Sequence, residues 1–169
     1  MNNKIFKLII CFTLLLLCTP SVCAKWRAKH VVFIGLDGWG ADSMEKANMP
    51  TVKQLMKDGS YTLEKRSVLP SSSAVNWASM FMGAGPELHG YTEWGSKTPE
   101  LPSRVLSHYG IFPSIWGFFR DANPQAEIGF FCQWNGLEYL AEMKAMSKEM
   151  HVKAQDDPSG KADRAVANH

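Results

Sequence analysis

Apolar runs alternate with polar, proline-punctuated stretches along the chain, and the pattern predicts three strands. Residues 31–36 form an unbroken apolar run rich in β-branched side chains, as is typical of a strand covered on both faces. Residues 61–69 and 127–133 predict two further strands. All three predicted strands are short, and polar sequence separates them.

Helical spacing of apolar residues predicts helices between and after these strands. The first begins at Pro50 and is ended by Gly59, and the second spans residues 74–82 before a Gly-Ala-Gly-Pro stretch. A third begins near Pro113, which suits the first turn of a helix, and ends at Asn123. Its Ile115, Trp116 and Phe119 are expected to face the core. Short helices are also predicted at residues 103–109 and 161–169, the latter after a loop at residues 156–160.

Strands that alternate with helices favour one fold class. We expect an α/β protein, a three-layer sandwich with a mostly parallel central sheet, incomplete at the C-terminus. The roughly 145 residues that follow the first apolar segment suit one domain with its own core. The sequence contains no internal repeat and no low-complexity tract.

The N-terminal segment has the features of a secretory signal peptide. Lys4 and Lys7 precede an apolar run over residues 8–18, and small residues follow at 21–24. The apolar run is shorter than the roughly 20 residues of a membrane-spanning helix. We therefore expect residues 1–24 to be a signal peptide cleaved after Ala24, leaving a periplasmic or secreted protein with no stable membrane insertion.

The net charge limits the kinds of molecule that the protein is expected to bind, and the cysteine content indicates the role of its thiol. Lys4 and Lys7 leave with the signal peptide and no acidic residue does, so the formal charge falls from +2 to zero. Without a basic surplus or a Lys/Arg stripe, a nucleic-acid polymer is not an expected partner. Only Cys132 lies outside the signal peptide, within an apolar run, which indicates a buried structural thiol.

Three polar residues lie at predicted positions that are typical of ligand binding: one at the end of a strand and two in the first turn of a helix. Asp37 follows the predicted strand 31–36, and ligands of open α/β sheets sit at such strand ends. Ser73 is placed at the start of a helix whose amides favour an anion, and Asn76 lies one turn later. Each also has a purely structural interpretation. Asp37 could be a turn or helix-capping residue, the serines at 71–73 an N-cap, and Asn76 simply a polar helix residue.

The combination resembles the type I phosphodiesterase/nucleotide pyrophosphatase family of the alkaline-phosphatase superfamily. The family's nucleophile segment reads P-T-x-T-x-x-N, then G, then P-E-x-H-G. The matching residues here, in the same order and spacing, are Pro70, Ser71, Ser73, Asn76, Gly83, Pro86, Glu87, His89 and Gly90. Gly35-Leu36-Asp37-Gly38 is similar to the family's first metal-ligand strand, and the resemblance covers about residues 29–135.

This resemblance implies roles for individual residues. Asp37 corresponds to a zinc ligand, and Ser73 to the nucleophile, itself bound to that metal. Asn76 corresponds to a hydrogen-bond donor to a phosphoryl oxygen, whereas His89 and Glu87 are interpreted as residues that fix a loop. The family implies two Zn²⁺ ions and a small phosphate-ester or nucleotide substrate.

Departures from the family pattern leave alternatives open. The nucleophile is Ser73 where this branch usually has threonine, so the substrate is open between monoester and diester. The family's later Asp-x-x-x-His ligand cluster does not occur, so residues 25–169 are expected to form an N-terminal portion that cannot hold the zinc ions or act alone. A non-catalytic remnant domain is the alternative. Trp39, Trp77 and Trp94 either line a base pocket or pack in the core or rim.

Overall fold

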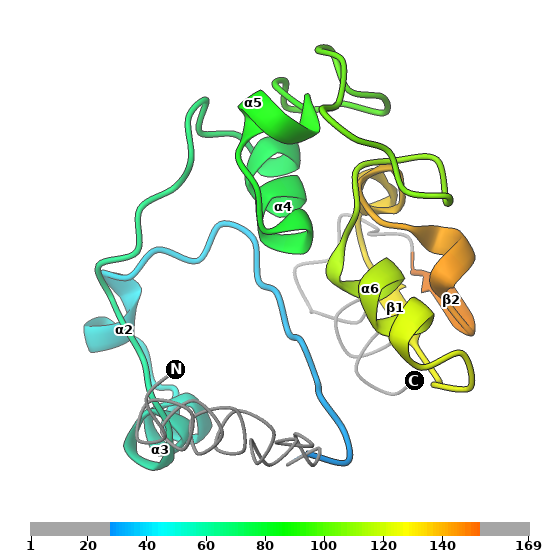
Figure 1. Cartoon of the computed structure of the whole chain (residues 1–169). Helices are drawn as coiled ribbons and strands as arrows, with labels where there is room; N and C mark the ends of the chain where they lie inside the picture. Colours follow the sequence, from blue (N-terminus) through cyan, green and yellow to red (C-terminus); the bar gives the residue numbers. More distant parts are fainter. Residues whose placement is uncertain (1–27, 153–169) are drawn as a thin grey trace, which may run out of the picture. The chain divides into compact units, whose positions relative to one another are not determined.

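The computed structural model describes residues 28–152 (Figure 1). The predicted signal peptide at 1–24, the predicted loop at 156–160 and the predicted helix at 161–169 lie outside these residues. The chain divides into two compact units at Leu36 and Asp37. Within the first, residues 28–36 contain no helix or strand and are exposed. The second contains all of the described helices and strands.

Helix α4 (Ser73–Met82) is the most deeply buried element of the second unit. Its sequence combines small and large apolar residues, and Ala74, Val75 and Ala78 have no exposed surface. The helix ends at Gly83, whose φ of +61° is a left-handed conformation that glycine adopts without a Cβ clash. The prediction of a helix over 74–82 ended by the glycine-rich stretch is confirmed.

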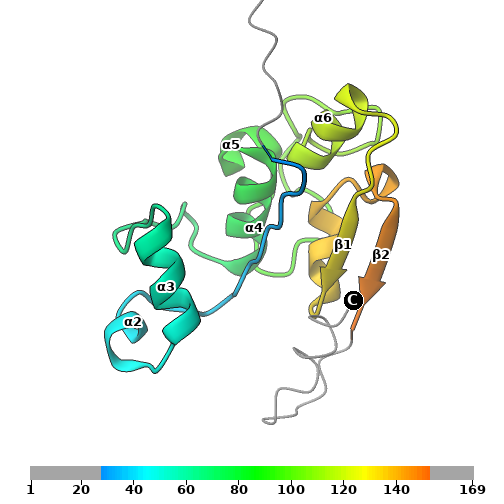
Figure 2. The same ribbon diagram turned by 90° about the horizontal axis from the view of Figure 1, so that it is seen from below.

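A two-stranded parallel sheet lies in the C-terminal part of the described chain (Figure 2). Strand β1 (Gly129–Cys132) pairs with β2 (Lys148–His151), with Gly129 opposite Lys148 and Cys132 opposite His151. Parallel strands need a long crossover connection, and here two short 3₁₀ helices form it. The strand predicted at 127–133 is confirmed, whereas β2 falls in a polar stretch for which no strand was predicted.

Short helices connect and surround these elements. Proline at the first position begins both α3 and α5, since proline fixes a helical φ and lacks the N–H that would remain unpaired there. Helix α3 confirms the prediction that began at Pro50. The bounds are α2 (Ser43–Lys46), α3 (Pro50–Asp58), α5 (Pro86–His89), α6 (Ile115–Ala122), η1 (Asn135–Leu140) and η2 (Met143–Ala145).

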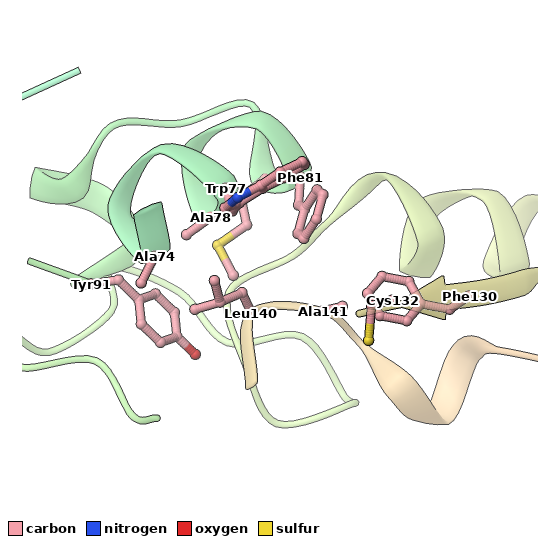
Figure 3. Packing of buried hydrophobic residues seen from close by; sticks show 10 residues of the cluster. Ala74, Trp77, Ala78, Phe81, Tyr91, Phe130, Cys132, Leu140 and Ala141 are labelled. Atoms are coloured by element: carbon pink, nitrogen blue, oxygen red, sulfur yellow. The ribbon is translucent and has the colours of Figure 1, made fainter. Parts of the chain in front are cut away.

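The hydrophobic core forms where α4 meets η1, α5 and α6. Figure 3 shows Trp77 and Phe81 of α4 near the core, with Leu140 of η1 below the helix. The Phe81 ring meets Trp116 at 4.5 Å and Phe130 at 6.3 Å, both edge-on, an arrangement that aromatic rings favour. The core therefore joins the helix that begins at Ser73 to the strand β1.

Two of the predicted strands are absent from the described residues. Residues 31–36 are extended but are not assigned to a strand, and Val31 and Ile34 expose 87% and 77% of their surface. Residues 61–69 also contain no strand. A strand exists only through its ladder with another strand, whereas an apolar run reveals only that its side chains favour burial. The expectation of a buried strand at residues 31–36 and of a further strand at residues 61–69 was wrong.

The helical predictions near residue 110 also need correction. No helix forms at residues 103–109, where the chain runs through bends and a turn. Helix α6 begins at Ile115, close to the predicted start, but Ile115 exposes 64% and Phe119 38% of their surface. Trp116 does pack against the core, as predicted. The apolar residues of α6 surround more of the helix than the single buried face can cover.

The fold class is α/β, with a two-stranded parallel sheet and several helices among residues 28–152. This sheet has only two strands, so the described residues do not contain the three-layer sandwich with a central sheet that was predicted. The described part of the chain contains no helix with both the length and the apolar character needed to cross a bilayer.

Candidate functional site

Ser73 occupies the first position of helix α4. Ser72 is the N-cap residue, and its side chain makes no capping hydrogen bond. The first intrahelical bond is donated by the Asn76 amide to the Ser72 carbonyl, at 3.0 Å. The amides before Asn76 therefore have no partner within the helix. The Ser73 hydroxyl, half-buried, lies beside these amides and forms no hydrogen bond within residues 28–152.

Asn76 holds the segment that leads into the helix. Its Oδ1 accepts a hydrogen bond from the Val68 amide at 3.0 Å, and its Nδ2 donates one to the Ser72 carbonyl at 3.0 Å. These bonds fix both ends of the Val68–Ser72 segment against the first turn of α4. One N–H of the Asn76 amide is used in this way, and an amide nitrogen carries two.

Asp37 is connected to α4 through a tryptophan. It lies in an exposed turn with Gly38, after the extended residues 31–36 rather than at the end of a strand. The Trp77 indole Nε1 donates a hydrogen bond to Asp37 Oδ2 at 3.1 Å. Ser73 and Trp77 are four residues apart, so their side chains neighbour each other on the helix surface. The structure thus joins Asp37 to the helix of Ser73, with no hydrogen bond between Asp37 and Ser73 among the described residues.

His89 lies at the end of α5 and is completely buried. Its Nδ1 accepts the Tyr91 amide at 3.1 Å, so the neutral ring carries its proton on Nε2, 3.0 Å from the Ser79 hydroxyl. Burial lowers the pKa of His89, and the nearby Glu87 carboxylate opposes this effect. The contacts agree with the loop-fixing role predicted for His89, because the ring ties α5 to α4.

A buried carboxylate that the sequence did not reveal lies at the start of α6. Glu142 exposes only 2% of its surface, and its Oε2 accepts bonds from the Ser114 amide (3.0 Å), the Ser114 hydroxyl (2.6 Å) and the Gly117 amide (2.8 Å). A Cβ at position 117 would collide with this carboxylate. Glu142 thus caps α6 from 28 residues away. An isolated acid in a polar stretch gave no signal of this role.

The tryptophans proposed for a base pocket have different environments. Trp77 is a core residue. Trp94 exposes 68% of its surface and stacks on Trp134, with ring centroids 6.0 Å apart and planes at 25°. Trp39 is 38% exposed. Packing in the core or rim, the alternative given above, describes Trp77 and Trp94, while the outer face of Trp94 remains accessible.

The predicted metal ligands Asp37 and Ser73 are too few to form a zinc site by themselves. A carboxylate and a hydroxyl, from Asp37 and Ser73, are suitable oxygen donors, but zinc takes about four ligands in proteins. Within residues 28–152 no group of three or more His, Cys, Asp or Glu side chains could hold a metal ion. The donor chemistry fits a divalent cation, and the number of donors does not complete the site.

Comparison with known proteins identifies the class to which this arrangement belongs. The family model described as type I phosphodiesterase / nucleotide pyrophosphatase matches residues 31–117, about half of the chain. The chain belongs to this family. The matched region contains Asp37, Ser73, Asn76 and His89 and ends within α6. No curated protein matches the chain. No solved structure matches it.

Proposed function

We propose that the chain contributes the nucleophile half of a phosphoric-ester hydrolase site, with Ser73 as the nucleophile. The family suggests hydrolysis of a small phosphate ester or nucleotide. The observation that carries the proposal is that the family match includes Asp37 and Ser73, while Trp77 connects Asp37 to the helix that Ser73 begins.

The surroundings of Ser73 suit attack on phosphorus. Its hydroxyl lies at a helix N-terminus without a side-chain cap, where unpaired amides and the helix dipole favour a phosphoryl group. Asn76 fixes the entry of the chain into this turn, and its second amide N–H is available to a phosphoryl oxygen. Both features support the binding of a phosphoryl group beside the Ser73 hydroxyl.

The proposed reaction has two displacement steps. Ser73 Oγ forms a bond to phosphorus while the bond to the leaving oxygen breaks, and the proton that the hydroxyl loses is balanced by the proton that the leaving oxygen takes up. Water then hydrolyses the seryl phosphate and regenerates the hydroxyl. Zn²⁺, when bound, supplies a lower pKa for a coordinated oxygen and neutralises phosphoryl charge. The two-zinc requirement, a larger central sheet in three layers, and a periplasmic or secreted location belong to this proposal.

The test compares two serines in the complete gene product. Ser73→Ala should abolish hydrolysis of both nitrophenyl phosphate and bis(nitrophenyl) phosphate, because no other hydroxyl replaces the attacking oxygen. Ser71→Ala is the control, because it alters a neighbouring exposed serine and should keep most of the activity. The ratio of the two activities distinguishes a monoesterase from a diesterase. Unchanged turnover in Ser73→Ala would exclude Ser73 as the nucleophile.

A chemical trap tests the same proposal without steady-state activity. Rapid acid quenching of the enzyme with nitrophenyl phosphate should leave phosphate on the peptide that contains Ser73, detected by mass spectrometry. The Ser73→Ala protein should carry none. Phosphate found on a different residue would assign the nucleophile elsewhere.

A further inference from the structure

Trp77 has two different environments at the two ends of its side chain. Its ring body belongs to the core and packs against Phe81, with centroids 5.5 Å apart (Figure 3). Only 7% of Trp77 is exposed. Its Nε1 leaves the core and donates to Asp37 Oδ2 at 3.1 Å. A rigidly packed ring therefore contacts an exposed carboxylate.

This contact restricts the orientation of Asp37. An indole nitrogen donates and cannot accept, so a buried indole needs an acceptor such as a carboxylate. An aspartate in an exposed turn otherwise has free choice among its side-chain rotamers. Because Trp77 holds Oδ2, the rotation of the carboxylate is restricted, and Oδ1 carries no bond to Trp77 and is free to bind a ligand.

The spacing of residues along α4 indicates on which side of the helix Asp37 lies relative to Ser73. Side chains on a helix lean toward its N-terminus, so the Trp77 indole leans toward the turn that begins at Ser73. Residues 73 and 77 lie on one face of the helix. Asp37 is therefore held on the same side of α4 as the Ser73 hydroxyl.

We infer that Trp77 is a positioning residue for Asp37: its indole N–H holds one carboxylate oxygen so that the other faces a divalent cation. Hydrogen-bonded partners of ligating carboxylates orient them and raise metal affinity. The cation-binding purpose rests on the proposed function, whereas the contact between Trp77 and Asp37 does not.

The contact itself is tested by NMR of the complete gene product labelled with ¹⁵N in the tryptophan indoles. Trp77→Phe identifies the Trp77 signal by its loss. Asp37→Ala should then shift this signal more than any other indole signal, because the acceptor is removed without a change in the core. Asp42→Ala, in the nearby exposed α2 N-cap, is the matched control and should leave it in place. An unmoved signal in Asp37→Ala overturns the inference.

The consequence is tested by titration of the metal-free gene product with Zn²⁺ in a calorimeter. Trp77→Phe should weaken binding about 10- to 100-fold, as loss of a partner of a metal ligand does. Trp116→Phe is the matched control, because it shortens another tryptophan packed on the same core and should leave affinity unchanged. Equal weakening in both variants would indicate a packing effect and overturn the inference, as would unchanged affinity in Trp77→Phe.

The two proposals can fail separately. If Ser73→Ala abolishes hydrolysis while Trp77→Phe binds Zn²⁺ as the unmodified protein does, the inference fails and the proposed function stands. If Trp77→Phe weakens Zn²⁺ binding but Ser73→Ala leaves turnover intact, the inference stands and the nucleophile is wrong. If the unmodified protein binds no Zn²⁺, the cation-orienting role is overturned.

Discussion

Helix α4 and residues 31–36 have similarly apolar sequences and different environments. In α4, Ala74, Val75 and Ala78 have no exposed surface. In residues 31–36, Val31 and Ile34 are among the most exposed apolar residues of the described chain. A helix pairs its backbone within itself and needs only one covered face, whereas an extended apolar segment needs partners from elsewhere. The stability of the described structure is therefore expected to come from α4 and its neighbours.

The largest expected effect is at Phe81, which contacts three other aromatic rings in the core. Phe81→Ala should lower the free energy of unfolding by about 3–5 kcal/mol, since it removes buried surface and leaves a cavity. Leu69→Ala is the contrasting variant, because Leu69 is 79% exposed and should change the free energy by less than about 0.5 kcal/mol. Urea denaturation measures both, and equal effects would show that α4 contributes no more to stability than an exposed position outside it.

A somewhat smaller loss is expected at Glu142. Glu142→Ala should cost about 3 kcal/mol, because three donors that it now satisfies would be buried without an acceptor. Glu149→Ala, on the exposed part of β2, should be nearly neutral. Urea denaturation again provides the measurement. A neutral Glu142→Ala would show that water replaces the carboxylate at the start of α6.

The buried His89 predicts that the free energy of unfolding depends on pH. Its pKa is lowered on folding from 6.5, so the unfolded chain binds the proton more tightly than the folded one. The stabilisation from a neutral His89 is complete above pH 6.5 and is lost as the pH falls below that value. Denaturation curves between pH 8 and pH 5 should show this loss. His89→Gln should remove that part of the slope, and an unchanged slope would assign the dependence to other groups.

The smallest effect is expected within residues 31–36. Val32 is 79% exposed, so Val32→Ser should change the free energy of unfolding by less than about 0.5 kcal/mol. A loss above about 1 kcal/mol in thermal or urea denaturation would show that this segment is buried in solution. That outcome would restore the interpretation of residues 31–36 as a covered strand.

The sequence predicted elements whose determinants are local. The helix at 74–82 follows from its small and apolar residues and the glycine that ends it, and α3 follows from Pro50 at its start. Strand β1 was recognisable from its apolar run, but its partner β2 contains Lys148, Glu149 and His151. Pairing of β2 depends on the β1 edge beside it, and that edge is not encoded in the residues of β2.

The sequence predicted only those residues of the candidate site that belong to a local pattern. Asp37, Ser73 and Asn76 were found from their spacing within a family pattern, and the family match includes all three. The Trp77 contact to Asp37 joins residues 40 positions apart and was not found. Glu142, which lies beyond the matched residues, was missed as well. Contacts between distant segments depend on packing, which local sequence patterns do not report.

Because Glu142 approaches Gly117 closely, the residue types at positions 117 and 142 are expected to depend on each other. Any side chain at 117 would meet the carboxylate, and a shorter residue at 142 would leave the Gly117 amide without its acceptor. A change at either position alone is therefore expected to disturb these hydrogen bonds, and a joint change removes the conflict. Among descendants of a common ancestor, glycine at 117 should be inherited together with glutamate at 142 and should vary where the acid has been lost.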